Sequence, residues 1–465
     1  MKSIWNNQEK LKFSDLSENI ETDVCIIGGG ITGISTAYNL IQSKKNVVVL
    51  EKNCISSHTT GGSTGKITSQ HGLIYKYLYE SNGKEYVRKY FEANEEAIKN
   101  IEEIIQKENI ECDFEKRDSY VFTEQGIKMD NIKQEVEYAK KIGINAKLIT
   151  EIDLPINIVG GIKFENQAQF NPVKYVLGLV NSIISKGGKI FENSKVIDIE
   201  EKNDRYIVST NKGTVSAKYV ILATRYPIMN FPGYYFLKMY QSTSYAMVFD
   251  TNTQLDTTGF YINAEQPTIS LRTIKYKNKN MLLIVGCDYK TGSKIAGNPF
   301  KYLENKVMSM YPNSKKIIEW TAEDCISLDK IPYIGNFSNV MKNMYVATGF
   351  NKWGITTSNI SAEIISDQIL GIKNKYEDIF KSSRLNPIKN KEEMMNMIKE
   401  SGNGIVLKKI KDTPNPTCSH LGCTLSWNAI EETWDCPCHG SRFTKERKSN
   451  WRSSYKRYRN EANSS

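Results

Sequence analysis

Short apolar runs and helical patterns alternate over the first fifty residues. Residues 23–27 (Asp-Val-Cys-Ile-Ile) predict a buried strand, residues 28–33 are rich in glycine, and a helical pattern continues to Ile41. A second apolar run, Val47–Leu50, predicts another strand, and Glu51 follows it. Strand, tight turn, helix and strand in this order predict a βαβ unit with a parallel sheet.

The same patterns predict further elements along the chain. A charged helix of about 25 residues is expected from Gly83, and a helix over residues 172–186 precedes four short strands. These strands are expected at residues 196–200, 206–210, 214–216 and 219–224. Strand-like runs follow at 245–249 and 281–285, and a strand at 344–349 leads through Gly354 into a long amphipathic helix.

The first glycine-rich turn carries candidate chemistry. Gly28, Gly30 and Gly33 follow the pattern G-x-G-x-x-G, which lets a pyrophosphate approach a helix N-terminus, and Glu51 is placed to bind a ribose hydroxyl. The motif alone is weak evidence, but the complete strand, turn, helix and acid predict dinucleotide binding. This unit leaves FAD and NAD open. No second G-x-G-x-x-G follows a strand, which argues against a reductase that carries both.

A second glycine-rich turn lies between Gly349 and Gly354. Taken alone, it is an ordinary connection between a strand and a helix. If it faces the cofactor, its helix N-terminus would stabilise the N1–C2=O edge of a reduced, anionic flavin.

Two boxes near the C-terminus each offer one thiol and one imidazole. Cys418 and His420 lie in the first box, and Cys436 and His439 lie in the second. This is the ligand pattern of a Rieske [2Fe–2S] centre, in which two cysteines hold one iron and two histidines hold the other. A zinc site also accepts two cysteines and two histidines, but zinc modules usually pair cysteine with cysteine and histidine with histidine. The mixed boxes therefore favour the iron–sulfur cluster.

Composition narrows the class of protein. With 465 residues, 40% hydrophobic and 25% charged, the chain is long enough for two or three globular domains. The net charge of +10 does not indicate nucleic acid, because residues 444–465 alone carry seven Lys or Arg against two Asp or Glu. No apolar run reaches membrane-spanning length and the first residues are not a secretory signal, so we expect no membrane span and a cytoplasmic location.

Together these motifs resemble the D-amino-acid-oxidase-like flavoproteins, which include glycine and sarcosine oxidases, and more closely the branch with a C-terminal Rieske domain. The resemblance covers roughly residues 15–443. It implies FAD and one Rieske cluster as cofactors, and a disulfide between Cys423 and Cys438 such as some Rieske proteins carry. The motifs that carry it are the Gly28 turn, residues 60–72, 221–224 and 324–335, the Gly349 turn and both cysteine–histidine boxes.

The resemblance also implies a fold class and a discontinuous layout. The fold class is an α/β, Rossmann-like FAD-binding domain with an α+β substrate domain and a small all-β Rieske domain. The FAD-binding domain would comprise residues 15–80, 150–228 and 322–375, and the substrate domain residues 81–149 and 229–321. Residues 376–404 are expected to be a linker, residues 405–446 the Rieske domain, and residues 447–465 an aberrant basic tail.

Several site residues are implied in the same way. Thr224 and Asp329 are expected to bind the cofactor, together with Gly349 and Gly354 of the second turn. Lys66 and His71 lie in the loop that the family folds against the flavin ring. There, Lys66 would orient water or tune the flavin potential, while contact with FAD phosphate or solvent is the alternative. Arg272 is placed to clamp a carboxylate, although a surface arginine is the simpler interpretation.

We therefore expect an enzyme, an FAD-dependent oxidoreductase that oxidises a small-molecule amine or amino acid by hydride transfer to flavin. Its electrons would pass singly to the Rieske cluster and on to an unidentified acceptor. Two alternatives stay open. One is a reductase fed through the cluster by a redox partner, and the other is a non-enzymatic electron carrier or redox sensor.

The C-terminal tail departs from the Rieske pattern after Phe443. Rieske domains continue with a glycine turn, a strand and a Gly-Pro loop, and none of these features is seen in the tail. With AT-rich codons chosen from Arg447 onward, loss of one base yields Gly-Lys-Val-Ile-Gly-Gly-Pro-Ala, which supplies them. We therefore hypothesise that a single-base frameshift produced residues 447–465. The alternative is a genuine basic tail, which would leave the cluster exposed, labile or absent.

Overall fold

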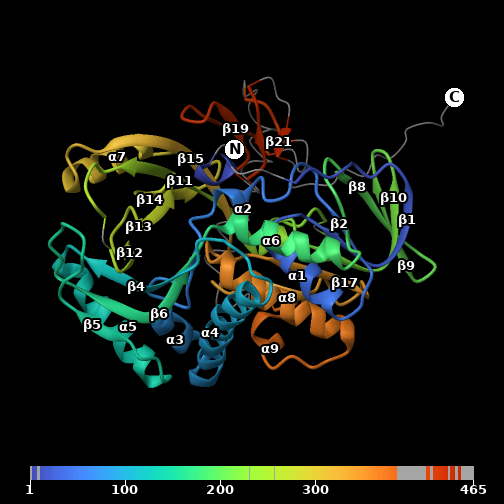
Figure 1. Ribbon diagram of the computed structural model, residues 1–465, viewed down its shortest axis with the longest axis horizontal. Coiled ribbons are helices and arrows are strands. Elements are labelled where there is room, and N and C mark those ends of the chain that lie inside the picture. Colours follow the sequence, from blue (N-terminus) through green and yellow to red (C-terminus); the bar gives the residue numbers. More distant parts are fainter. Residues whose placement is uncertain are drawn as a thin grey trace.

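Two large β-sheets meet around a group of buried helices, and a small third sheet from the C-terminal residues lies against them (Figure 1). The protein is described by a computed structural model. It describes residues 3–7, 11–229, 231–255, 257–384, 415–418, 423–437, 440–445 and 449–451.

The first sheet contains the predicted βαβ unit. The pairs β1–β2, β1–β10, β2–β7 and β10–β17 are parallel, as expected for this unit. In spatial order its described strands are β16 (Tyr333–Asn336), β17 (Met344–Thr348), β10 (Thr214–Leu222), β1 (Asn19–Ile27), β2 (Val47–Leu50) and β7 (Lys189–Phe191), with the hairpin of β8 (Val196–Lys202) and β9 (Arg205–Thr210) attached to β10.

A single strand, β10, runs where two strands were expected at 214–216 and 219–224. It pairs with β1 along its whole length, from Thr214 opposite Asn19 to Leu222 opposite Ile27. Ala217 and Lys218, between the two expected strands, do not end β10, because the ladder with β1 satisfies its backbone hydrogen-bonding groups.

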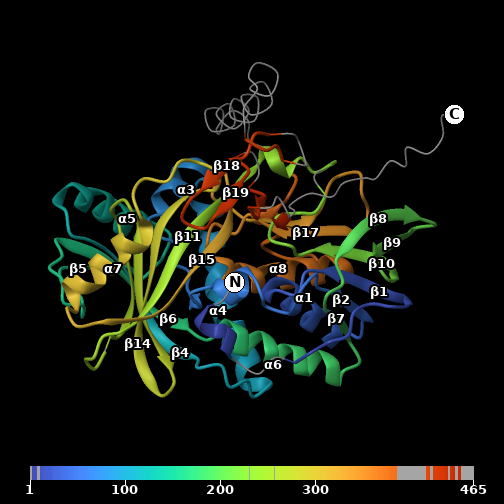
Figure 2. The same cartoon turned by 90° about the horizontal axis from the view of Figure 1, so that it is seen from above.

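Four helices surround this sheet and its neighbour: α1 (Ile31–Gln42), α4 (Lys84–Lys107), α6 (Pro172–Ser185) and α8 (Gly354–Leu370). Helix α1 contacts both α6 and α8, and α4 contacts α8 (Figure 2). Helix α6 begins at Pro172 because the side chain of Asn171 caps it, accepting hydrogen bonds from the backbone N–H groups of Val173 and Lys174.

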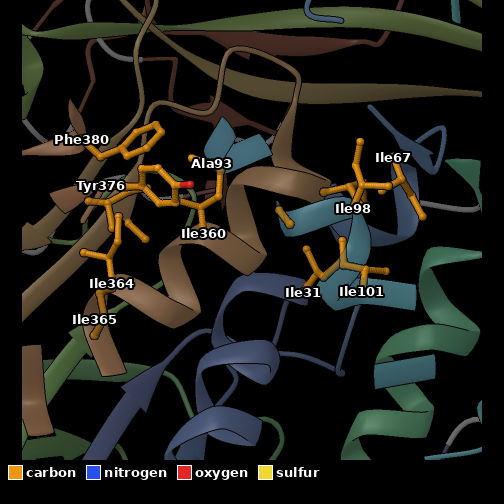
Figure 3. Close-up of a cluster of buried hydrophobic side chains, with 14 of the residues drawn as sticks. Ile31, Ile67, Ala93, Ile98, Ile101, Ile360, Ile364, Ile365, Tyr376 and Phe380 are labelled. Carbon is orange, nitrogen blue, oxygen red and sulfur yellow. The ribbon is translucent and has the colours of Figure 1, made fainter. Parts of the chain in front are cut away.

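The expectation that α8 is amphipathic is wrong. Twelve of its seventeen residues are buried, because α1 and α4 both pack against it. Figure 3 shows Ile360 and Ile364 of α8 in the same apolar cluster as Ile31 of α1 and Ile101 of α4. A helix covered on several sides needs no polar stripe along its length.

The second sheet is mostly antiparallel. Its strands β3, β6 and the end of β15 come from segments that the sequence assigned to the FAD-binding part, because strand pairing between distant segments leaves no local pattern. In spatial order its described strands are β15 (Lys315–Ser327), β11 (Met239–Asp250), β14 (Lys279–Lys290), β13 (Ile269–Tyr276), β12 (Gly259–Asn263), β4 (Glu115–Thr123), β6 (Gly160–Gln169) and β3 (Lys66–Ile67), with β5 (Lys147–Ile149) on β6.

Further helices occur in the described residues. No helix in the described residues is long and apolar enough to cross a membrane. These helices are η1 (Ile4–Asn7), α2 (Thr59–Gly62), α3 (Tyr75–Asn82), η2 (Gly126–Lys128), α5 (Met129–Lys141), η3 (Tyr235–Leu237), α7 (Pro299–Met310) and α9 (Glu377–Phe380).

The C-terminal sheet is formed by β18 (Ser426–Asn428), β19 (Thr433–Asp435), β20 (Arg442–Phe443) and β21 (Ser449–Trp451), in that order and antiparallel. Strand β21 lies inside the tail that was expected to lack a strand, so that expectation is wrong. Pairing with the free edge of β20 uses backbone groups, which any non-proline residue supplies. The frameshift itself stays a hypothesis.

The expected linker does not begin at residue 376. Tyr376, Ile379 and Phe380 are buried in the same cluster as α4 and α8. The ring of Phe380 lies 5.9 Å from that of Tyr90 on α4. Residues 376–380 therefore pack with the large bodies, although their Lys- and Glu-rich neighbours had suggested a linker.

This packing gives a stability prediction. Phe380→Ala removes a buried ring and should cost about 3–5 kcal/mol of unfolding free energy, measured as a lower urea midpoint. Lys381→Ala is the control, because Lys381 is exposed and pairs only with the exposed Asp378. It should change the midpoint little. Equal midpoints for Phe380→Ala and the unmodified protein would contradict the packing.

Candidate active site

One cavity lies where the two large sheets meet. Residues at the ends of β1, β2 and β10 line one side, and residues of β11, β13, β14 and β15 line the other. The turns that precede α1 and α8 close it, and Gly440 of the C-terminal part also reaches its wall.

The first glycine-rich turn is as tight as the sequence suggested. Gly28 has φ +116°, and a Cβ atom there would lie 2.5 Å from the carbonyl oxygen of Ala223. A Cβ on Gly33 would lie 2.0 Å from the carbonyl oxygen of Gly28. Gly28 and Gly30 line the cavity, and the hydroxyl of Thr60 accepts a hydrogen bond from the backbone N–H of Ile31 at 2.9 Å. The bare backbone of the two glycines in front of this helix N-terminus fits a pyrophosphate.

Glu51 is buried at the end of β2 and lines the cavity. Its carboxylate accepts hydrogen bonds from the backbone N–H groups of Gly29 at 2.8 Å and Asn53 at 2.9 Å. Burial raises the pKa of Glu51, and these two hydrogen bonds oppose that rise. The acid therefore also braces the glycine-rich turn, while its contact with a ribose stays a prediction.

The second glycine-rich turn faces the same cavity. Gly349 has φ +71°, and it lines the cavity together with Lys352, Trp353 and Gly354. The hydroxyls of Thr32 on α1 and Ser358 on α8 hydrogen-bond at 2.8 Å. The two helices therefore begin side by side, and both N-termini are available to a negatively charged cofactor.

Thr224 and Asp329 have different positions. Thr224 lines the cavity, and its hydroxyl donates to the carbonyl oxygen of Tyr226 at 2.8 Å. Asp329 is not among the residues that line it. Its carboxylate forms an ion pair with Arg384 at 2.6 Å, so it is engaged elsewhere.

Lys66 lines the cavity and donates to the hydroxyl of Ser270. Burial lowers its pKa to about 7, and the positive charges of Arg272 and Lys352 contribute. The ring of His71 stacks on the ring of Trp353, with 4.7 Å between the ring centroids. Burial lowers the pKa of His71 to about 3, so the ring is neutral and supports Trp353.

Arg272 is buried at 3% exposure, not at the surface. It does not line the cavity, and its Nη2 lies 3.4 Å from the carbonyl oxygen of Phe170. Burial lowers its pKa to about 9. Its Nε has no hydrogen-bond partner among the described residues. Arg272 therefore places a second positive charge close enough to Lys66 to lower its pKa.

Sequence reasoning missed the charged residues on the opposite wall. Asp288 of β14 and Lys352 form an ion pair at 2.7 Å, and both line the cavity together with Asp324 of β15. Asp324 lies in the segment 324–335 and Lys352 in the segment 349–354, and the sequence pointed to both segments as motifs. Asp288 had no sequence signal.

Two contacts hold the C-terminal part against the cavity wall. A Cβ on Gly440 would lie 2.6 Å from the Cβ of Gln241, which lines the cavity. A Cβ on Gly292, after β14, would lie 2.6 Å from the Cα of Pro437. Glycine is required at position 292 because a Cβ there would meet the backbone of Pro437, and Gly440 has φ +68°, a conformation that favours glycine, with the side chain of Gln241 against it.

A buried ionic network joins the same surfaces. Glu323 of β15 pairs with Arg225, which lines the cavity, and with Arg442 of β20 at 3.0 Å. Arg442 also pairs with Asp435 at 3.0 Å and with Glu431. Burial alone would raise the pKa of Glu323, but the two arginines outweigh it and hold the pKa below its usual value. Glu323 therefore stays ionised at neutral pH.

The described cluster ligands fit an iron–sulfur centre. Cys418 and Cys436 are buried in one small core with Cys423, and the backbone N–H of Cys418 donates to the carbonyl oxygen of Cys423 at 2.8 Å. Two buried thiols in one core are the donor set that one iron of the cluster requires. His420, Cys438 and His439 lie outside the described residues, so their roles and the disulfide with Cys423 stay predictions.

A dinucleotide cavity between a parallel sheet and a second sheet, with cluster cysteines beside it, defines a flavoprotein oxidoreductase that carries an iron–sulfur domain. The model of the FAD dependent oxidoreductase family matches residues 23–368, and that of the Rieske [2Fe-2S] domain matches residues 391–455. The chain belongs to the FAD-dependent oxidoreductase family and carries a C-terminal Rieske domain, so the expected enzyme class and both cofactors are confirmed.

Related proteins share this architecture in whole or in part. The putative Rieske 2Fe-2S iron-sulfur protein YhfW of Bacillus subtilis is 33% identical, over 94% of this chain and 93% of that protein. Gamma-glutamylputrescine oxidoreductase of Escherichia coli is 22% identical over 78% of this chain and 87% of that protein. The structure of glycine oxidase from Geobacillus kaustophilus has a TM-score of 0.65 at 17% identity, covers 79% of this chain and all of its own, and confirms the fold.

The glycine-rich turn gives a test of FAD binding. Gly30→Glu places a carboxylate at the start of α1, where it would repel the pyrophosphate, so the protein should purify without FAD. Gly126→Glu is the matched control, because nothing lies within 4 Å of a Cβ at that exposed glycine. It should keep one FAD per chain by absorbance. A normal flavin spectrum in Gly30→Glu would refute the assignment.

The ionic network gives a second test. Arg442→Met removes the cation shared by Glu323, Asp435 and the partly buried Glu431, which should cost about 3–5 kcal/mol and loosen the C-terminal part. We expect faster proteolysis of that part with the FAD spectrum retained. Arg88→Met removes an exposed arginine that pairs with Glu85 and Glu92, and should change nothing measurable. Unchanged proteolysis of Arg442→Met would contradict a network that holds the two parts together.

Proposed function

We propose that this enzyme oxidises an amine or amino acid and passes the electrons to its own Rieske cluster. FAD bound in the cavity would supply a two-electron acceptor for the hydride on the carbon next to nitrogen, and the Rieske cluster would supply a one-electron acceptor. The neutral amine would lose this hydride together with a proton from its nitrogen, two electrons and two protons in all, and leave as an imine. An external acceptor then takes the two electrons in turn, and a cytoplasmic location for this exchange stays a prediction.

One observation carries this proposal. Gly440, between the cluster-ligand box and β20, lines the same cavity as Gly28 and Gly349. The ion pairs from Arg225 through Glu323 to Arg442 link the two parts directly. A cluster held at the flavin cavity can receive electrons without movement of a domain.

Relatives support the class of donor. Gamma-glutamylputrescine oxidoreductase and a D-amino acid dehydrogenase of Helicobacter pylori, which is 23% identical over 75% of this chain, act on amines or amino acids by name. Dehydrogenation of such donors requires an uncharged nitrogen, because an ammonium group cannot support the loss of hydride from its neighbouring carbon.

Lys66 is suited to remove that proton. Its amine lies at the cavity with a pKa of about 7. This amine hydrogen-bonds to the hydroxyl of Ser270, and the ring centroids of Phe260 and Trp353 lie 5.9 Å from it. The neutral amine accepts a proton from the substrate ammonium, which then has the free pair needed for hydride loss. The positive charge of Arg272 disfavours the protonated form of Lys66.

This role predicts a pH dependence. Because the pKa of Lys66 is lowered to about 7, the amine is neutral above that pH and protonated below it. The rate of flavin bleaching by a saturating amine should rise as pH increases through about 7, and Lys66→Met should lose this step. Lys66→Arg, charged at every pH used, should be slow throughout. The same step in Lys66→Met would exclude Lys66 as the proton acceptor.

The function as a whole is tested by anaerobic mixing with a panel of amines and amino acids. We expect the flavin to bleach and the Rieske signal to appear afterwards in electron paramagnetic resonance. Glu323→Gln, which weakens the link between Arg225 and Arg442, should slow the second phase more than the first. Failure of every donor to bleach the flavin would favour a reductase fed by a partner or a redox sensor.

A further inference from the structure

The second cluster-ligand box lies directly against a turn of the second sheet. A Cβ on Gly292, in the turn after β14, would lie 2.6 Å from the backbone N and Cα atoms of Pro437 and 2.7 Å from the carbonyl carbon of Cys436. Cys436 itself is fully buried. The turn after β14 therefore helps to cover this cluster ligand and to fix its position relative to the flavin cavity.

Tyr226, after β10 of the first sheet, lies beside the same box. The preceding residue, Arg225, donates to the side chain of Gln241 at 2.9 Å, and a Cβ on Gly440 would lie 2.6 Å from the Cβ of Gln241. Tyr226 and Gly440 both line the flavin cavity. The backbone N–H of Gly440 donates to the carbonyl oxygen of Cys436 at 2.8 Å, so Tyr226 stands close to the loop that carries this ligand.

The hydroxyl of Tyr226 is buried and has no hydrogen-bond partner among the residues that the structure describes. A buried donor without a partner destabilises the fold, so an unpaired hydroxyl at such a position needs an explanation. Burial raises the pKa of Tyr226 well above its usual value, and negative charge on Cys325 and Cys436 raises it further. The hydroxyl therefore keeps its proton and can donate it to a nearby acceptor.

Two sulfur atoms could accept this proton. Burial raises the pKa of Cys325 to about 12, so its thiol is neutral and a weak acceptor. Cys436 binds iron as a thiolate in the assembled cluster, because a cysteine ligand must be deprotonated. The anionic sulfur is the stronger acceptor of the two.

We propose that the hydroxyl of Tyr226 donates a hydrogen bond to the sulfur of Cys436 once the cluster is assembled. A hydrogen bond to a cluster sulfur stabilises the reduced, more negative state and raises the reduction potential. Because Tyr226 belongs to the flavin-binding part, the cluster has this raised potential only while the C-terminal part lies on the cavity wall. The contact depends on the Rieske cluster and not on the amine substrate, so failure of the proposed function would leave it standing.

Tyr226→Phe tests the contact, because it keeps the ring and removes only the hydroxyl. The midpoint potential of the cluster is measured on the holoenzyme by redox titration, followed by the Rieske signal in electron paramagnetic resonance. The equilibrium constant for reduction should fall about tenfold, as expected for one hydrogen bond to a charged group. This is about 59 mV for a one-electron couple.

Tyr235→Phe is the matched control for this variant. Tyr235 lies in the same apolar cluster as Tyr226, and its hydroxyl donates to the carbonyl oxygen of Phe337 at 2.8 Å. Its loss should leave the cluster potential unchanged. An unchanged potential in Tyr226→Phe, or an equal fall in both variants, would overturn the proposal.

The turn after β14 gives a second, independent test. Gly292→Ala places a methyl group against the backbone of Pro437 and should move Cys436 away from Tyr226. The potential should fall in Gly292→Ala, and adding Tyr226→Phe should lower it no further, because both changes remove the same hydrogen bond. Gly297→Ala is the control, since Gly297 also has a positive φ, +70°, and nothing lies within 4 Å of a Cβ there. Two falls that simply add in the double variant would refute the contact.

Discussion

The carboxylate of Glu323 is the interaction on which the relation between the two redox parts depends. It is shared by Arg225, at the flavin cavity, and Arg442, in the Rieske part. A buried carboxylate without a cation is costly, so Glu323 depends on both arginines. Because one arginine lies at the flavin cavity and the other in the C-terminal sheet, this shared carboxylate ties the iron–sulfur part to the wall of the cavity.

The cavity itself depends on two helices that start at the same place. Helices α1 and α8 each begin at a glycine-rich turn, and the Thr32–Ser358 hydrogen bond keeps their first turns adjacent. Their partial positive charges make this end of the cavity suitable for phosphate and for a reduced flavin. The buried apolar cluster of α1, α4 and α8 packs these helices together, which helps to keep the first turns of α1 and α8 adjacent (Figure 3).

Charge is distributed unevenly around the remaining walls. Lys66 lies on one wall with a lowered pKa, and the buried Arg272, outside the cavity lining, contributes to that shift. Asp288, Asp324 and Lys352 lie on the opposite wall, where Lys352 pairs with Asp288. Charges that are partly shielded from water interact over longer distances than charges at the surface.

The sequence by itself determined the parts whose chemistry depends on close neighbours in the chain. The Gly28 turn, the strand before Glu51, the Gly349 turn and the cysteine–histidine boxes all lie within short segments. Local patterns were therefore enough to predict a dinucleotide site and a Rieske centre, and the resemblance to a flavoprotein family then implied FAD. Tertiary structure alone decided which strands share a sheet, why α8 is buried, and why Asp329 lies away from the cavity. It also brought Asp288, Asp324 and Lys352 to one wall, and Arg225, Glu323 and Arg442 into one network. Contacts between residues far apart in the chain arise from packing and strand pairing, which leave no periodic signal in the sequence.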